Sequence, residues 1–197
     1  EILYPEICTL YGDKGNTMYL QKCLPDAEFV TTGLNEKPLF LKENIDMVYM
    51  CSMSEKSQEL VLDRLMQYKD EIAACMKDGK ALFLLVGNSM ELLGDYIKRE
   101  DGTRVTGLGV VPGMYSVRQA PNRFNTLIKA KFNDMTLIGY TSRFAHTYGI
   151  PDDMTFCKVE IGQGSNPDTM NEGICKNRVI ATYIHGPLLI QNPDFVH

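Results

Sequence analysis

The stretch Ala81-Leu82-Phe83-Leu84-Leu85-Val86, followed directly by Gly87-Asn88-Ser89-Met90-Glu91-Leu92-Leu93, decides the fold class. Six consecutive apolar residues between two glycine-containing turns are typical of a parallel strand that is buried on both faces. Gly87-Asn88-Ser89 then turns the chain, and we expect a helix from Met90. The carboxyl end of a strand thus meets the start of a helix, which is where α/β proteins place their ligands.

The rest of the chain supplies partners for this strand. Before it, short β-favouring runs lie at 7–11, 27–31 and 46–51, a helix is expected from near Thr17, and apolar spacing predicts one long amphipathic helix over 54–77. After it, strands are predicted at 114–118, 126–132, 136–141, 156–161 and 179–184, with little helix between them. We therefore predict a single α/β domain over 1–197, with a mainly parallel sheet, helices on both faces and an antiparallel extension.

Composition and charge exclude several classes of protein. The 197 residues include 20 Lys and Arg against 25 Asp and Glu, so a net charge of −5 makes nucleic acid and anionic membranes poor partners. The longest apolar run is far shorter than the ~20 residues of a membrane span. The six cysteines contain no C-x-x-C pair, so we expect free thiols in a reducing cytoplasm and no metal or other cofactor.

Two features could carry chemistry at the strand ends. A sharp turn at Gly87 would expose backbone N–H groups that can hold an oxyanion, and His185 directly follows the predicted strand 179–184. A nearby imidazole can act as a general base. A hydrogen-bonded structural histidine is the alternative interpretation of His185.

Several segments resemble the class I glutamine amidotransferases of the cobyric-acid-synthase, or CobQ-like, type. They are Leu10-Tyr11-Gly12-Asp13-Lys14-Gly15-Asn16, Met90-Glu91-Leu92-Leu93-Gly94, Gly107-Leu108-Gly109-Val110-Val111-Pro112-Gly113, and Thr182-Tyr183-Ile184-His185-Gly186-Pro187-Leu188-Leu189 with Asn192-Pro193. The resemblance implies a flavodoxin-like, three-layer domain. It also implies a subunit that passes ammonia from glutamine to an ATP-dependent, Mur-ligase-like partner that amidates a cell-wall precursor, or to a cobyrinate-type amidation system.

The resemblance fails at the nucleophile. The family elbow reads C-G-G-Y-Q-L-L-G, and ungapped alignment puts Gly87 where the cysteine attacks the glutamine amide. The next two glycines have become Asn88 and Ser89, and the glutamine has become Glu91. Because glycine has no side chain, it cannot form an acyl-enzyme. We therefore predict that this chain lacks glutaminase activity.

A second glycine-rich loop of the family, G-G-G-x-D-x-x-Q, reads here Cys51-Ser52-Met53-Ser54-Glu55-Lys56-Ser57-Gln58. Glycines let backbone N–H groups approach an oxyanion, so side chains at these positions should crowd the pocket. The resemblance would place Ser52, Met53 and Asn88 against the substrate, make Asp13 the residue that orients His185, and make Arg123 the residue that holds glutamine.

An active hydrolase is the alternative. Gly87-Asn88-Ser89-Met90-Glu91 resembles the G-x-S-x-G elbow of α/β-hydrolases, so Ser89 could attack an amide or ester with His185 as base. Against it, Glu91 replaces the last glycine, and its carboxylate would oppose a developing oxyanion. We expect Ser89 to be a helix N-cap instead. Cys51 is a weaker candidate nucleophile, because a thiol in that apolar setting is expected to be buried.

Overall fold

The apolar run forms strand β4 (Leu82–Val86), as predicted. In the computed structural model, which describes residues 1–196, β4 pairs in parallel with β3 (Met47–Met50) on one side and β13 (Val179–Thr182) on the other. These strands lie inside a nine-stranded sheet of order β2-β1-β3-β4-β13-β12-β11-β8-β9. The last four residues of β4 are buried, which is the environment that its sequence predicts.

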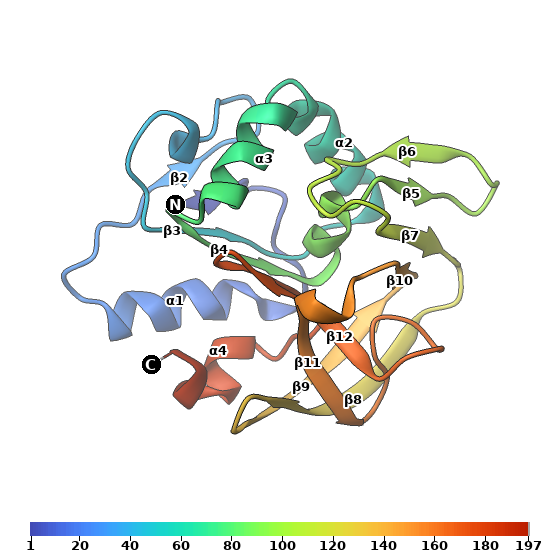
Figure 1. The fold of residues 1–197 in the computed structure, drawn as a ribbon. Coiled ribbons are helices and arrows are strands. Elements are labelled where there is room, and N and C mark those ends of the chain that lie inside the picture. Colours follow the sequence, from blue (N-terminus) through green and yellow to red (C-terminus); the bar gives the residue numbers. More distant parts are fainter. Residues whose placement is uncertain (197) are drawn as a thin grey trace.

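The sheet has a parallel and an antiparallel half (Figure 1). The parallel half is completed by β1 (Ile2–Leu3) and β2 (Thr31–Thr32). The antiparallel half is the predicted extension, and it comprises β8 (Phe124–Phe132), β9 (Met135–Arg143), β11 (Thr155–Ile161) and β12 (Asn171–Lys176).

A second sheet of four strands was not predicted as a separate unit. Its order is β10-β7-β5-β6, with bounds Ala145–Tyr148, Tyr115–Arg118, Tyr96–Lys98 and Arg104–Thr106. Arg99 and Arg118 both pair with the carboxylate of Glu59, at 2.8 and 2.6 Å, and so tie this sheet to a helix of the main layer.

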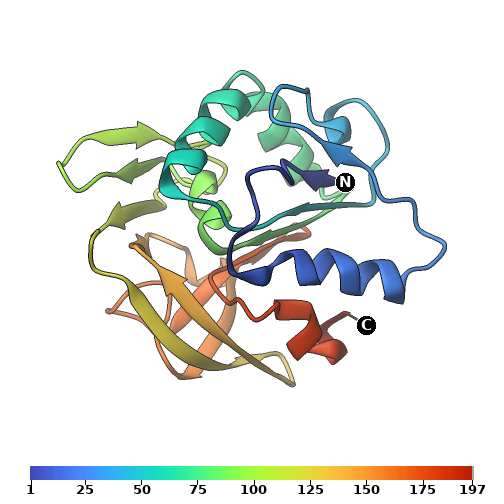
Figure 2. The ribbon, with the colours of Figure 1, turned by 180° about the vertical axis from the view of Figure 1, so that it is seen from behind.

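Helices cover both faces of the main sheet (Figures 1 and 2). The helices α2 (Glu55–Met66) and α3 (Lys69–Asp78) lie on one face, and α1 (Lys14–Cys23) and α4 (Leu188–Gln191) lie side by side on the other. Short 3-10 helices lie at Leu10–Gly12, Leu39–Leu41, Gly87–Leu93, Asp152–Met154 and Pro193–Val196. No helix within residues 1–196 combines the length and the apolar character needed to span a membrane.

Four of the predicted elements are wrong in detail. The strand predicted at 27–31 is reduced to the two residues of β2, Thr31–Thr32, which overlap it only at Thr31. Residues 7–11 do not form a strand, because Tyr11 has a φ of +59° and the chain there enters a 3-10 turn. The helix predicted over 54–77 breaks at Tyr68, whose φ and ψ of −114° and 14° lie outside the helical range. The helix predicted from Met90 is a 3-10 segment, Gly87–Leu93, whose residues are buried except for Asn88.

Candidate functional site

The site lies where three strand ends and the start of α1 meet. The loop after β3 carries Ser52, the turn after β4 carries Gly87, and the segment after β13 carries His185. Asp13 precedes α1. Gly87 has a φ of +71°, in the left-handed region that favours glycine, so the chain does turn sharply at this point.

Asp13, Ser52 and His185 form a closed polar cluster. His185 Nδ1 lies 3.1 Å from Asp13 Oδ2, so the two side chains are within hydrogen-bond distance of each other. The hydroxyl of Ser52 donates to the same Asp13 Oδ2 at 3.1 Å and lies 3.4 Å from His185 Nδ1. The three residues are 0%, 1% and 1% exposed, so the cluster is shut off from solvent.

The space that a side chain of residue 87 would need is already filled. A Cβ atom built on Gly87 would lie 1.9 Å from Ser52 Oγ, 2.9 Å from Ser52 Cβ and 2.6 Å from His185 Cε1. Cβ atoms in folded proteins essentially never lie this close to a non-bonded heavy atom, so a neighbouring side chain would have to move. The side chain of Ser52 therefore stands in the place from which a residue-87 nucleophile would project.

Asn88 fastens the turn after β4 to the loop after β3. The N–H of Met53 donates to Asn88 Oδ1 at 3.0 Å, and Asn88 Nδ2 donates back to the carbonyl oxygen of Met53 at 2.8 Å. The Met53 amide is thus already hydrogen-bonded inside the protein. It is not free to bind a developing oxyanion.

Ser89 and Glu91 point into the core. The hydroxyl of Ser89 donates to the carbonyl oxygens of Val86 and Met50, at 2.8 and 3.2 Å. The predicted N-cap role is wrong, because an N-cap hydroxyl accepts a bond from an amide. Glu91 accepts bonds from Gln58 and Tyr183, and burial raises the pKa of its carboxyl.

Cys51 and Arg123 also have partners outside the polar cluster. The thiol of Cys51 is directed to the carbonyl oxygen of Cys8 at 2.6 Å, and burial raises the pKa of Cys51 to about 12. The guanidinium of Arg123 is exposed and lies 4.6 Å from the ring centre of Phe144. The structure therefore brings Asp13, Ser52, Gly87 and His185 together and leaves Ser89, Cys51 and Arg123 bonded or stacked elsewhere.

Sequence reasoning missed the two tyrosines that flank the imidazole. The rings of Tyr11 and Tyr140 lie 4.6 and 5.6 Å from that of His185, and the Tyr140 hydroxyl donates to the carbonyl oxygen of Tyr11. Tyr140 and His185 also exchange backbone hydrogen bonds. This approach needs Gly139, where a Cβ would lie 2.3 Å from His185 O, and a glycine inside a strand was the available signal.

Comparison with known proteins identifies the family of this chain. The family model described as CobB/CobQ-like glutamine amidotransferase domain matches residues 2–193. The chain belongs to this family. Among the residues that the structure describes, no group of three or more His, Cys, Asp or Glu side chains is arranged to hold a metal ion.

Two curated relatives carry the same name, "Lipid II isoglutaminyl synthase (glutamine-hydrolyzing) subunit GatD". The one from Streptococcus pneumoniae is 27% identical over 199 residues, which is 99% of this chain and 76% of the relative. The one from Staphylococcus aureus is 26% identical over 186 residues, with coverage of 93% and 74%.

Two solved structures share the fold. PurLQS from Thermotoga maritima matches with a TM-score of 0.63 over 93% of this chain and 85% of its own. A structure described as a glutamine amidotransferase matches with a TM-score of 0.65 over 99% and 94%. Each is 12% identical to this chain, so these matches confirm the predicted fold class and nothing more.

Proposed function

We propose that this chain is a GatD-like glutamine amidotransferase subunit that has lost glutamine hydrolysis and acts as a binding or regulatory partner of an ATP-dependent, Mur-ligase-like subunit. The observation that carries the proposal is the position of Ser52 Oγ, 1.9 Å from where a Cβ on residue 87 would lie. A missing nucleophile whose space is refilled by a neighbouring loop indicates a site that no longer needs that space.

Ser52 is poorly placed to replace the thiol. In a working triad the acid binds one ring nitrogen of the histidine and the nucleophile binds the other. Here Asp13 and Ser52 both face Nδ1 of His185, so the nitrogen needed to take the serine proton is the one that faces the acid. Burial of all three residues also keeps substrate away from the hydroxyl.

The oxyanion side of the reaction is lost as well. The amide of Met53 is held by Asn88, so stabilisation of a tetrahedral intermediate at this amide would first require the Asn88 side chain to leave. The alternative hydrolase gains no support, since both Ser89 and Cys51 direct their reactive atoms at backbone carbonyl oxygens. Removal of a catalytic nucleophile costs up to ~10⁶ in rate.

The partner is proposed from the relatives, which are named as subunits of a lipid II isoglutaminyl synthase. A cell-wall precursor is the corresponding acceptor, with a cobyrinate-type acceptor as the family's other option. We place the subunit in the cytoplasm, because an ATP-dependent ligase works there and because the cysteines are unpaired. The whole of residues 1–197 is proposed to act as one domain.

The test compares this protein with the Streptococcus pneumoniae GatD relative under identical conditions. Each is incubated with glutamine, with and without the Mur-ligase-like protein encoded in the same genome, and glutamate is measured. Each is then treated with an electrophilic glutamine analogue and weighed intact. We expect glutamate and a covalent adduct from the relative only, together with co-elution of this chain and its ligase. Glutamate release by this chain, or an adduct on Ser52, Ser89 or Cys51, would overturn the proposal.

A further inference from the structure

The four-stranded sheet has two different faces. Its inner face carries Ile97, Ser116 and Thr147, which are 0% exposed and pair across the strands. Residues on either side of these along each strand point the other way. Two cross-strand rows therefore point away from the inner face, Thr106-Tyr96-Tyr115-Tyr148 and Arg104-Lys98-Val117-His146, and all of their residues are at least partly exposed except His146, which is buried against Phe124.

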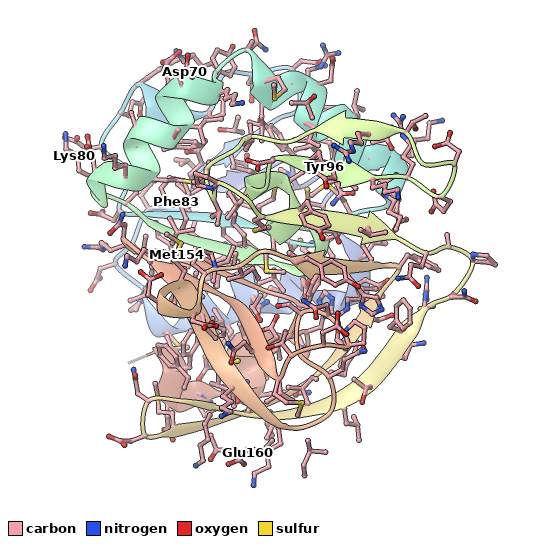
Figure 3. The ribbon with its side chains drawn as sticks, turned by 45° about the vertical axis from the view of Figure 1, so that its right-hand side comes forward. Asp70, Lys80, Phe83, Tyr96, Met154 and Glu160 are labelled. Carbon is pink, nitrogen blue, oxygen red and sulfur yellow. The ribbon has the colours of Figure 1, made fainter. Side chains whose placement is uncertain are left out.

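The first row is an aromatic ladder at the surface. The ring centres of Tyr96 and Tyr115 are 5.2 Å apart and those of Tyr115 and Tyr148 are 5.5 Å apart, with the rings tilted by only 13° and 18°. All three tyrosines remain partly exposed. The guanidinium of Arg104 lies 4.1 Å from the ring centre of Tyr96 and extends the ladder by one step. Figure 3 shows the side chain of Tyr96 on this face of the small sheet.

The second row gives the face a positive charge. Lys98 and Arg104 are both exposed and lie directly opposite each other on adjacent strands. Like charges in that position destabilise a sheet. None of the eight residues in the two rows is acidic, and neither cation makes an ion pair within residues 1–196. In a chain of net charge −5, two exposed cations without an ion-pair partner make this face a suitable surface for carboxylates of a partner.

The sheet is also joined to the site. The hydroxyls of Thr147 and Tyr183 lie 2.6 Å apart, and the Tyr183 hydroxyl donates to Glu91 in the turn after β4. Tyr183 stands two residues before His185. The inner face of this sheet is therefore connected to the site by hydrogen bonds.

We propose that the outer face of this sheet is the docking surface for an acidic patch on the Mur-ligase-like subunit, an inference that rests on the proposed function. Tyrosine and arginine are the residue types that dominate binding energy at protein interfaces. The tyrosine ladder supplies rigid apolar area, and Lys98 and Arg104 supply attraction and orientation toward carboxylates. Binding of an acidic protein surface would thus use both the aromatic row and the two cations.

The test variant is Lys98→Glu/Arg104→Glu. It keeps a like-charged pair on the same two strands, so the sheet faces a repulsion similar to the one it already tolerates. The matched control is Lys22→Glu/Lys80→Glu, which changes the net charge by the same amount at exposed positions in α1 and beside β4. Binding of each to the ligase subunit from the same genome is measured by titration calorimetry at low and high salt, and folding is checked by thermal unfolding.

We expect the Lys98/Arg104 variant to bind the ligase about tenfold more weakly or worse at low salt, with a flatter salt dependence, and the control to bind like wild type. Equal loss in both variants, or unchanged binding in the first, would refute this docking surface. Failure of wild type to bind the ligase at all would instead refute the proposed partner. A second variant, Tyr115→Ala, is expected to weaken binding at every salt concentration, because its contribution is apolar; a loss confined to low salt would count against the ladder.

Discussion

Gly87→Cys, which returns a thiol to the end of β4, is expected to destabilise the protein without restoring chemistry. The new Cβ would overlap Ser52 Oγ and press on His185 Cε1, at 1.9 and 2.6 Å. Overpacking of this kind costs about 1–3 kcal/mol. The left-handed φ of +71° adds about 1–2 kcal/mol for any residue with a Cβ.

Adding Ser52→Gly removes two of the three close contacts but not the backbone strain. The two substitutions should therefore be coupled, with a double-mutant-cycle energy of about 1–3 kcal/mol in favour of the double variant. For a domain of this size, each kcal/mol of stability corresponds to about 2–4 °C in Tm. Ser52→Gly alone provides the control for the lost hydrogen bond to Asp13.

The assay is thermal unfolding of wild type, the two single variants and the double variant. These four proteins, and a triple variant that adds Asn88→Gly, are then treated with an electrophilic glutamine analogue and examined by mass spectrometry. We expect the single Gly87→Cys variant to be the least stable and unreactive, and we expect adduct formation to need Ser52→Gly and the further change Asn88→Gly, which frees the Met53 amide. A Gly87→Cys protein as stable as wild type, or one that forms the adduct without the other changes, would refute the reasoning.

Three further predictions concern the contact between the two loops, the loss of stability at acidic pH and the reactivity of two thiols. Asn88→Ala removes both bonds to the neighbouring loop and should cost about 1–3 kcal/mol in urea unfolding, whereas exposed Asn125→Ala should change little. Hydrogen bonds from its two arginine partners lower the pKa of Glu59 to about 2. The contribution of Glu59 to stability is therefore present above the ordinary pKa of 4.5 and is lost as the pH falls toward 2. Glu59→Gln should make the loss of stability at acidic pH less steep in unfolding experiments, and an unchanged slope would contradict this prediction. Iodoacetamide at pH 8 should label exposed Cys23 and spare Cys51, whose pKa is raised to about 12; equal labelling of the two in native protein would be the opposite result.

The fold was predictable where sequence pattern and burial coincide. The run 81–86 is typical of an interior strand, because no polar residue interrupts it and glycines bound it. The alternating runs near 126–132 and 136–141 form the hairpin of β8 and β9. The run 7–11 misled, because its apolar residues line a turn. No glycine or proline marks the break at Tyr68, so periodicity alone could not find it.

The site was predictable in its backbone and its polar pair, but not in its packing. The positions of Asp13, Gly87 and His185 follow from strand ends and from the family motifs. The side chain of Ser52 fills the space next to Gly87 because of how two loops, 35 residues apart in the sequence, pack against each other. No local sequence pattern encodes that packing. The same holds for the Asn88 clamp on Met53, since a side-chain amide can find many backbone partners.

The pairing of Asp13 with His185 joins a residue near the start of the chain to one near its finish. Because both are fully enclosed, losing either would strand a polar group in the interior, at a cost of several kcal/mol. A mutation that removes a nucleophile at position 87 therefore costs the fold less stability than one that removes Asp13 or His185. A chain that loses its nucleophile can therefore keep this buried pair as a structural link between two segments far apart in sequence.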